Sequence, residues 1–156
     1  MNELKDGLEA IFSAQLKNRV SLAKTGSRER KRKLKLLLAT FLEMEEEATA
    51  ALYADMKKSP TEAAITETMG IKTEASFAIK NLRKWMKTKR VGAPLTVSFT
   101  RGWVRPEPKG TVLIISPWNY PILLVLNPLI AAVAAGNTAI IKPSEFTPAS
   151  GLFVKK

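Results

Sequence analysis

Two proline-rich stretches carry the polar side chains whose types and spacing could do chemistry. The first, ISPWNYP at 115–121, holds the amide of Asn119, and the second, KPSEFTP at 142–148, holds Lys142 and Glu145 three residues apart. Proline fixes its own φ and removes a backbone donor, so we expect both stretches to be rigid. If these side chains do no chemistry, Asn119 could instead cap the helix that follows it. Lys142 and Glu145 could likewise be an ordinary surface pair.

The chain contains no cysteine and no histidine among its 156 residues. These absences exclude, within this sequence, a thiol nucleophile, a disulfide, a Cys or His metal site and a histidine base. The composition, 46% hydrophobic and 25% charged, is ordinary for a soluble globular protein. Residues 1–20 are amphipathic and do not resemble a signal peptide, so the cytoplasm is the expected compartment.

Most of the positive charge lies in one segment. Residues 17–35 contain nine basic residues and one acidic residue, which gives +8 of the net charge of +11. A run of this kind is usually a solvated helix face, which we favour. A nucleic-acid-binding patch is the alternative, although few aromatic residues are interleaved to stack on bases.

Residues 1–90 have the periodicity of helices. One helical face predicts a helix that is capped at Thr25 or Ser27, with apolar residues at Leu34, Leu37, Leu38, Phe41 and Leu42, and then at Ala48 and Leu52. Ser59, Pro60 and Glu62 form a helix-start signature. A helix is therefore expected from Pro60 toward Arg90, burying Ile65, Met69, Ala75, Ile79, Leu82 and Met86.

The pattern changes to short strands after Val91. We expect a hairpin of strands 95–99 and 103–105, and then a strand at 111–115 whose apolar, β-branched residues are typical of burial on both faces. A helix follows from Pro121 to Ala135, ended by Gly136 and kinked by Pro128. At about 22 Å it is too short for a membrane span.

A strand at 138–142 and a helix beginning at Thr147-Pro148 complete this part. The predicted fold class is α/β: N-terminal helices, a β-hairpin and the first βαβ unit of a Rossmann-like parallel sheet, incomplete as given. Ligands in such sheets bind beyond the carboxyl ends of the strands, where both proline-rich stretches lie. Neither GxGxxG nor a P-loop motif is present, so these motifs do not identify a nucleotide as the ligand.

Three motifs in this order closely resemble the aldehyde dehydrogenase superfamily: PWNYP at 117–121, AGN at 135–137 and IKPSE at 141–145. Tyr120 and the KSPTE segment at 58–62 look like the class 3 branch, which oxidises fatty and aromatic aldehydes. The resemblance covers essentially the whole chain. It implies NAD(P)-dependent oxidation of aldehydes to carboxylic acids through a cysteine thioester, in a homodimer. From the helix length and the composition of the basic segment, membrane and nucleic-acid partners are not expected for this portion.

The resemblance also implies roles for individual residues. Asn119 matches the family's amide donor to the oxyanion, a group that must be held rigidly, and the flanking prolines and Trp118 would hold it. Lys142 and Glu145 match the residues at the adenosine ribose of NAD, with NADP possible. The stretch Ile115, Ser116, Pro117 and Trp118 matches the lining of the cofactor cleft. Tyr120 matches a wall of the substrate tunnel, with ordinary packing as its alternative.

The family's cysteine nucleophile, glutamate base and glycine-rich turn are not found in this sequence. We therefore expect the N-terminal third of a longer dehydrogenase, with a helical segment at 1–90 and the start of the dinucleotide-binding domain at 91–156. Alone, such a chain would be inactive and would expose apolar surface. The alternative is a non-catalytic fragment that binds nucleotide or pairs with a full-length subunit.

Overall fold

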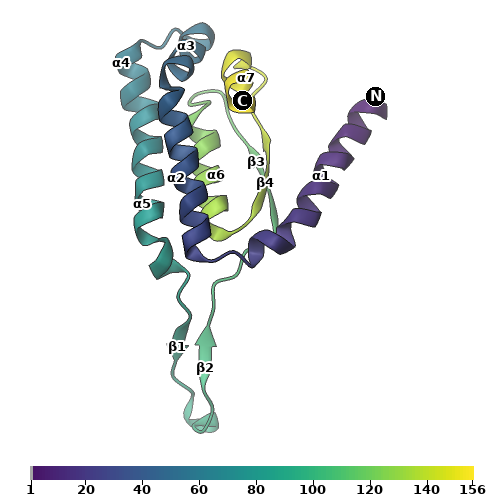
Figure 1. The fold of residues 1–156 in the computed structure, drawn as a ribbon, viewed down its shortest axis with the longest axis vertical. Helices are drawn as coiled ribbons and strands as arrows, with labels where there is room; N and C mark the ends of the chain where they lie inside the picture. The colour runs from purple at the N-terminus through teal and green to yellow at the C-terminus, as the bar shows by residue number, and fades with distance from the viewer. Residues whose placement is uncertain (1) are drawn as a thin grey trace.

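A computed structural model describes residues 2–156, with side chains from Lys5 onward. The expected helical character of the first part is confirmed. The elements are α1 (Asn2–Ala23), α2 (Ser27–Glu43), α3 (Glu45–Met56), α4 (Pro60–Ala63), a π-helical turn (Ala64–Thr68) and α5 (Met69–Trp85). Helices α2 and α5 run side by side, whereas α1 diverges from the body (Figure 1).

The second part contains the expected βαβ unit. Its elements are β1 (Lys89–Val91), a 3-10 turn (Leu95–Val97), β2 (Gly102–Val104), β3 (Thr111–Ile115), α6 (Leu123–Ala135), β4 (Thr138–Lys142) and α7 (Pro148–Lys155). Strands β3 and β4 are parallel, with Thr111 opposite Thr138 and Ile115 opposite Lys142. Within residues 2–156 none of the helices, α6 included, is long and apolar enough to cross a membrane.

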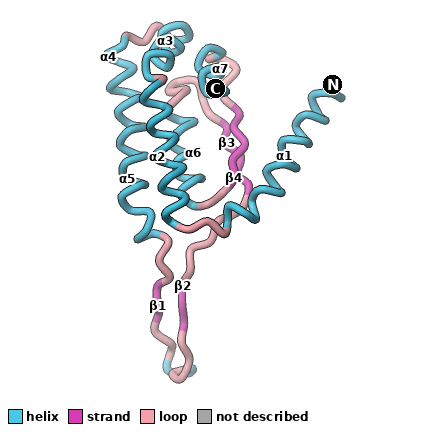
Figure 2. The backbone as a smooth tube through the Cα atoms, viewed as in Figure 1, coloured by secondary structure: helices cyan, strands magenta, loops and turns pink. Residues whose placement is uncertain are grey.

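The hydrophobic core lies among α2, α5 and α6, and β3 and β4 lie beyond α6 (Figure 2). Helices α5 and α6 approach closely at Gly70, where a Cβ would lie 2.8 Å from Leu123 Cδ1. Glycine therefore permits this contact, and the helix continues through it. The core draws residues from both sides of position 91, so the division into two segments there stays a prediction; its fully buried members include Leu34, Leu52, Ile71, Leu82, Ile122 and Ile130.

The predicted start of the second helix is wrong by one residue. The N-cap is Gly26, whose side chain offers no cap, and not Thr25 or Ser27. The Thr25 hydroxyl instead accepts a hydrogen bond from Arg30 Nε at 3.0 Å. The helix is also interrupted at Met44, where α2 ends and α3 begins, so the apolar periodicity spans two helices. Leu42, predicted on the apolar face, is exposed.

The helix predicted from Pro60 is capped by Ser59, as expected, because Glu62 N donates to Ser59 Oγ at 3.2 Å. Its buried face is partly wrong, since Ile65 and Met69 are exposed. The π-helical turn at 64–68 contains one more residue than a regular helical turn. The side chains from this turn onward therefore point in other directions than a regular α-helix would give them. Consequently Glu67, together with Thr68, faces the interior instead. Ala75 and Leu82 are buried as predicted, and Ile79 and Met86 pack partly buried against the core.

The hairpin exists, but its first strand is not 95–99. β1 pairs antiparallel with β2, with Arg90 opposite Trp103. Residues 94–100 satisfy their backbone locally, because Val97 N donates to the Pro94 carbonyl at 2.9 Å and Thr100 N donates to the Val97 carbonyl at 2.9 Å. The β-prone residues of this segment therefore form the tip of a hairpin that projects from the body (Figure 1).

Strand β3 is not buried on both faces as predicted. Ile114 is buried, whereas Leu113 and Ile115 are exposed. Helix α6 packs against both β3 and β4, and the described sheet consists of these two strands. Helix α1 also contacts β4 and β3, but Leu113 and Ile115 stay exposed, so the cover of β3 is incomplete.

Candidate functional site

The two proline-rich loops meet at the carboxyl ends of β3 and β4. Ser116 N donates to the Lys142 carbonyl at 3.1 Å, which continues the parallel ladder by one step beyond β3. Ser116 is buried at this junction. The sequence therefore correctly predicted that residues 115–121 and 142–148 lie side by side at this edge of the sheet.

Asn119 is fixed through its backbone and not through its side chain. Its carbonyl accepts a hydrogen bond from Lys58 Nζ at 3.1 Å. The side chain is exposed, and no protein group within residues 5–156 hydrogen-bonds to its amide. This geometry leaves the Asn119 amide available as a donor while its Cα position is held.

The alternative role of Asn119 as a helix cap is wrong. The first turn of α6 is capped by Glu67, whose Oε2 accepts hydrogen bonds from Ile122 N and Leu123 N, each at 3.0 Å. Free N–H groups and the helix dipole both favour a carboxylate at this position. The cap comes from the π-helical turn in the first part of the chain and not from the loop itself.

Glu67 also forms a buried ion pair with Lys58, and we call Lys58–Glu67 the buried pair. Lys58 Nζ donates to Glu67 Oε1 at 2.7 Å, and the two side chains are 6% and 1% exposed. The same ammonium lies 4.3 Å from the ring centroid of Tyr120, within the range of a cation–π interaction. Lys58 and Glu67 together therefore contact four residues of one short segment: Asn119, Tyr120, Ile122 and Leu123.

Sequence reasoning missed the role of Glu67, although a signal was present. The residue lies four positions after Ala63 and four before Ile71, both of which are fully buried. A carboxylate on the apolar face of a helix is rarely buried without a partner. That position alone could have marked Glu67 as a partner for a buried cation or for free N–H groups.

Lys142 and Glu145 form an ion pair of their own, which we call the exposed pair. Their side chains are 53% and 68% exposed. The hydrogen bond from Lys142 lowers the pKa of Glu145, and a backbone hydrogen bond and the lysine charge act in the same direction. The loop between them is shaped by Ser144, whose Oγ accepts from Phe146 N at 3.2 Å.

The remaining predicted cleft residues differ in exposure. Ser116 is buried, whereas Ile115, Pro117 and Trp118 are exposed. Trp118 is 55% exposed, so its packing does not hold the loop, contrary to expectation. The contacts of the buried pair and the two prolines fix the loop instead.

A second carboxylate caps the helix after the other loop. Asp55 Oδ1 accepts from Ala149 N at 3.0 Å, and Asp55 Oδ2 accepts from Ser150 N and Ser150 Oγ, each at 2.7 Å. Asp55 lies in α3, and the capped helix is α7. Each loop is thus followed by a helix that the N-terminal helices cap from outside.

Residues 3–156 match the model of the aldehyde dehydrogenase family. The chain belongs to this family. It is 44% identical to a 4,4'-diaponeurosporen-aldehyde dehydrogenase of Staphylococcus aureus over 149 residues, covering 95% of this chain and 31% of the relative. It is 46% identical to mouse aldehyde dehydrogenase family 3 member B1 over 100 residues, covering 64% of this chain and 21% of the relative.

The solved structure of substrate-bound Staphylococcus aureus AldH superimposes with a TM-score of 0.91 at 41% identity, covering 95% of this chain and 32% of that one. The resemblance to the class 3 branch is thus supported by relatives that include family 3 members. The chain spans about a third of the length of its first curated relatives (31% and 32%). The activity of a whole aldehyde dehydrogenase is therefore a proposal for this chain.

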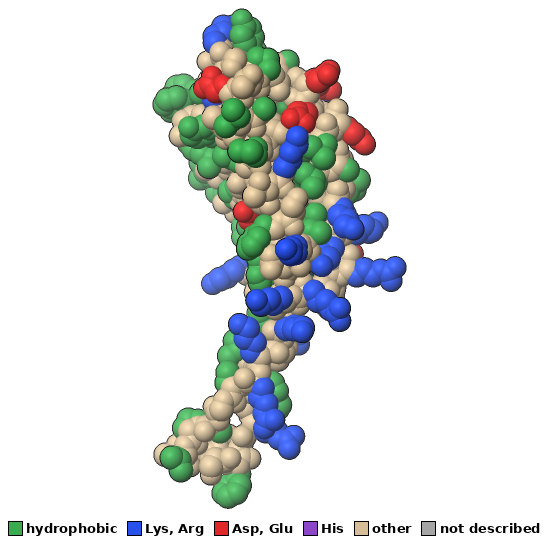
Figure 3. Space-filling view, turned by 90° about the vertical axis from the view of Figure 1, so that its left-hand side faces the viewer, with side chains coloured by type: hydrophobic (Ala, Val, Ile, Leu, Met, Phe, Trp, Pro, Cys, Tyr) green, Lys and Arg blue, Asp and Glu red, His purple; other side chains and the backbone are tan. Residues whose placement is uncertain are grey.

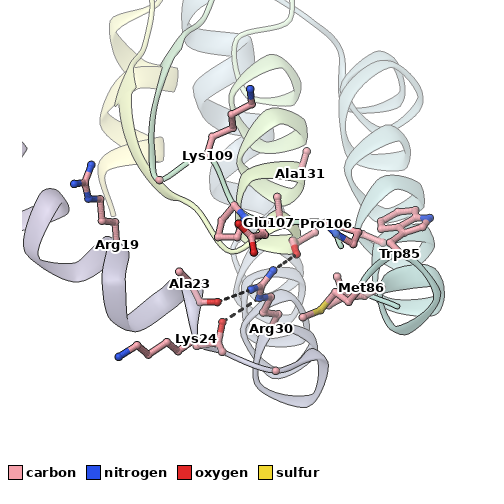
Figure 4. A pocket seen from close by; sticks show the side chains of 18 of the residues that line it. Arg19, Ala23, Lys24, Arg30, Trp85, Met86, Pro106, Glu107, Lys109 and Ala131 are labelled. Carbon is pink, nitrogen blue, oxygen red and sulfur yellow. Dashed lines mark hydrogen bonds between the residues drawn. The ribbon is translucent and has the colours of Figure 1, made fainter. Parts of the chain in front are cut away.

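A cavity of about 890 Å³ lies far from the two loops of this family member (Figure 4). Its lining includes Gly110, just before β3, and Ala134 near the end of α6, which places it at the amino ends of the strands. Arg30 forms part of its wall and donates to the Ala134 carbonyl at 3.1 Å. Burial lowers the pKa of Arg30. Through its bond to Ala134, Arg30 binds the carboxyl end of α6.

The basic segment 17–35 spreads over the end of α1 and the first half of α2. Arg30 is buried, and the other basic side chains of the segment are exposed or half-buried. In Figure 3, Lys and Arg side chains are also scattered over the lower half of the body, and hydrophobic ones are exposed at the tip of the hairpin. The segment therefore has the features of a solvated helix face with one structural arginine.

Proposed function

We propose that this chain provides the oxyanion donor and part of the cofactor site for NAD(P)-dependent oxidation of aldehydes to carboxylic acids. One observation carries the proposal. The Asn119 amide is exposed at the carboxyl end of β3, while the Asn119 carbonyl is held by a buried ammonium at 3.1 Å. A donor whose backbone is held, and whose amide has no partner among residues 5–156, suits a charge that develops only during reaction.

Attack of a thiolate on an aldehyde carbonyl moves an electron pair onto the carbonyl oxygen. The Asn119 amide would donate a hydrogen bond to that oxyanion. The chain contains no cysteine, so the thiolate must come from outside these 156 residues. Accordingly, we propose that these residues alone do not oxidise aldehydes.

The exposed pair fits the hydroxyl-rich part of a dinucleotide. The Glu145 carboxylate can accept hydrogen bonds from two ribose hydroxyls, and the Lys142 ammonium can donate to one of them. The two side chains pair with each other and are more than half exposed, so they can exchange partners for a ligand. Ile115, Ser116, Pro117 and Trp118 are proposed to line the adjoining cleft. When bound, the nicotinamide accepts the hydride that the reaction releases.

We propose NAD as the preferred cofactor, with NADP also used. A 2′-phosphate would bring a charge of about −1.5 to −2 close to the Glu145 carboxylate. Lys142 would partly offset this repulsion. The discrimination is modest because opposite charges at a solvent-exposed site interact weakly.

Tyr120 is proposed as a wall of the aldehyde site, with fatty or aromatic aldehydes as substrates. It follows Asn119 directly, and its ring is part-exposed while one approach is taken by Lys58. We also propose a homodimer, supported by exposed apolar residues of the projecting hairpin, which include Leu95, Phe99 and Trp103. The cytoplasmic location stays a prediction from the sequence.

The test is Asn119→Ala in the complete enzyme that contains this chain. Loss of one oxyanion donor should lower kcat by about 100- to 1000-fold, with little change in the cofactor KM. Asn81→Ala is the matched control, because the Asn81 amide donates to the Phe77 carbonyl on α5, away from both loops. An Asn119→Ala enzyme with unchanged kcat would refute the proposal and favour a non-catalytic, nucleotide-binding or subunit-pairing role.

A further inference from the structure

The buried pair has no direct access to a substrate. Lys58 and Glu67 are 6% and 1% exposed, so neither side chain is accessible to a reacting atom outside the protein. Their polar contacts nevertheless converge on the segment that carries the Asn119 amide. A role in the reaction would have to act through that segment.

The contacts fix this segment at two points. On one side, Lys58 Nζ binds the Asn119 carbonyl at 3.1 Å. On the other side, Glu67 Oε2 binds Ile122 N and Leu123 N at 3.0 Å each, at the entrance of α6. Because Lys58 and Glu67 are joined at 2.7 Å, the two anchoring points belong to one rigid unit.

The local structure gives up apolar burial to bring Glu67 to this position. The π-helical turn at 64–68 directs Glu67 inward, while Ile65 and Met69 are exposed on the same helix. A regular α-helix would not add the extra residue to this turn. Single π-helical turns within helices are frequent at functional sites, and burying an ion pair is not in itself an efficient source of stability.

We infer that the buried pair is a positioning device for the Asn119 amide. Lys58 sets the position of the Asn119 carbonyl, and Glu67 orients Lys58 while it fixes the start of α6. The backbone that carries the amide is thereby placed before substrate arrives, although the side chain itself has no hydrogen-bond partner among the described residues. This inference rests on the proposed function, in which Asn119 stabilises an oxyanion.

The principal test is Lys58→Met in the complete enzyme. Methionine keeps most of the aliphatic stem but removes the ammonium, so the Asn119 carbonyl loses its donor. Misplacement of a catalytic group by about 1 Å can cost about 100-fold in rate, so we expect kcat to fall by about 10- to 100-fold. The cofactor KM should change by less than about twofold, because loss of an interaction made only in the transition state lowers kcat and kcat/KM equally.

The decisive measurement is a double-mutant cycle with Asn119→Ala. If Lys58 acts through Asn119, Lys58→Met should change kcat by less than about threefold in the Asn119→Ala background. An equal fold-change in both backgrounds would overturn the inference. If Asn119→Ala alone left kcat unchanged, the proposed function would fail; if it lowered kcat but Lys58→Met did not, only the positioning role would fail.

Two further variants separate positioning from folding. Lys72→Met removes another lysine–glutamate pair between α5 and α3, in which Lys72 Nζ lies 2.9 Å from Glu45 Oε2 and makes no contact with either loop, and it should leave kcat unchanged. Glu67→Gln keeps a carbonyl oxygen for the α6 cap but removes the charge that orients Lys58. If Lys58→Met does not fold, Glu67→Gln should show the same loss of kcat and the same cycle with Asn119→Ala; wild-type kcat in a folded Glu67→Gln enzyme would overturn the inference.

Discussion

Both loops at the carboxyl edge of the sheet are associated with a lysine–glutamate pair, and the two pairs have opposite surroundings. The buried pair is at most 6% exposed and contacts the backbone of the loop after β3. The exposed pair lies in the loop after β4, with side chains 53% and 68% exposed. A buried pair cannot exchange partners without leaving a charge unpaired, whereas an exposed pair can. The buried pair therefore suits a donor that must not move, and the exposed pair suits a ligand that comes and goes.

The largest difference between the pairs should appear in stability. Glu67→Ala removes one partner of the buried pair and the cap of α6, so we expect the complete enzyme to lose about 3–5 kcal/mol of unfolding free energy. Glu145→Ala should leave stability unchanged, because its partners are solvated. Urea-induced unfolding of both variants measures the difference, and equal midpoints for the two would contradict the comparison.

A smaller effect is expected on the preference for NAD over NADP. Glu145→Gln removes the charge that would repel a 2′-phosphate, so the preference for NAD over NADP should narrow by several-fold, acting on KM with kcat unchanged. Steady-state kinetics with each cofactor in the complete enzyme provides the measurement. Asn119→Ala should instead lower kcat with little change in the cofactor KM. If both variants changed kcat and KM in the same way, the assignment of catalysis to the first loop and of cofactor binding to the second would be wrong.

The smallest effect concerns pH. The pKa of Glu145 is lowered, mainly by its hydrogen bond from Lys142. A lowered pKa means that the carboxylate stays ionised through the usual titration range of glutamate, and its contribution to binding is lost only as the pH falls through the lowered value. Cofactor affinity, measured by equilibrium binding, should therefore be constant from neutrality through the usual titration range of glutamate. It should decrease only when the pH falls through the lowered pKa of Glu145. Glu145→Gln should remove this acid limb, and a limb that persists in the variant would assign it to another group.

The sequence predicted the positions of both loops but not what holds the first of them. Strands at 111–115 and 138–142 were readable from continuous apolar runs, and the capping signature at Ser59 was readable from residue types. The path from Glu67 to Ile122 spans 55 positions. Such a contact depends on how α5 packs against α6, which local propensity does not specify.

The errors have related causes. A period of 3.6 residues cannot reveal a π-helical turn, so it places Ile65 and Met69 on the buried face, whereas both are exposed. The apolar composition of β3 predicts burial on both faces, but composition does not determine which elements pack beside a strand. The first hairpin strand was misplaced because β-prone residues at 95–99 form turns when Pro94 leads them.

The contact between Arg30 and Gly136 limits how this family member can vary at the far end of α6. Gly136 has φ +85°, and a Cβ there would lie 2.3 Å from Arg30 Cζ. Two independent obstacles therefore oppose any other residue at position 136: the left-handed backbone, and the Arg30 side chain that occupies the space of a Cβ. Shortening Arg30 would remove only the second, and it would also leave the Ala134 carbonyl without its donor. No change at Arg30 alone can therefore compensate for the loss of this glycine.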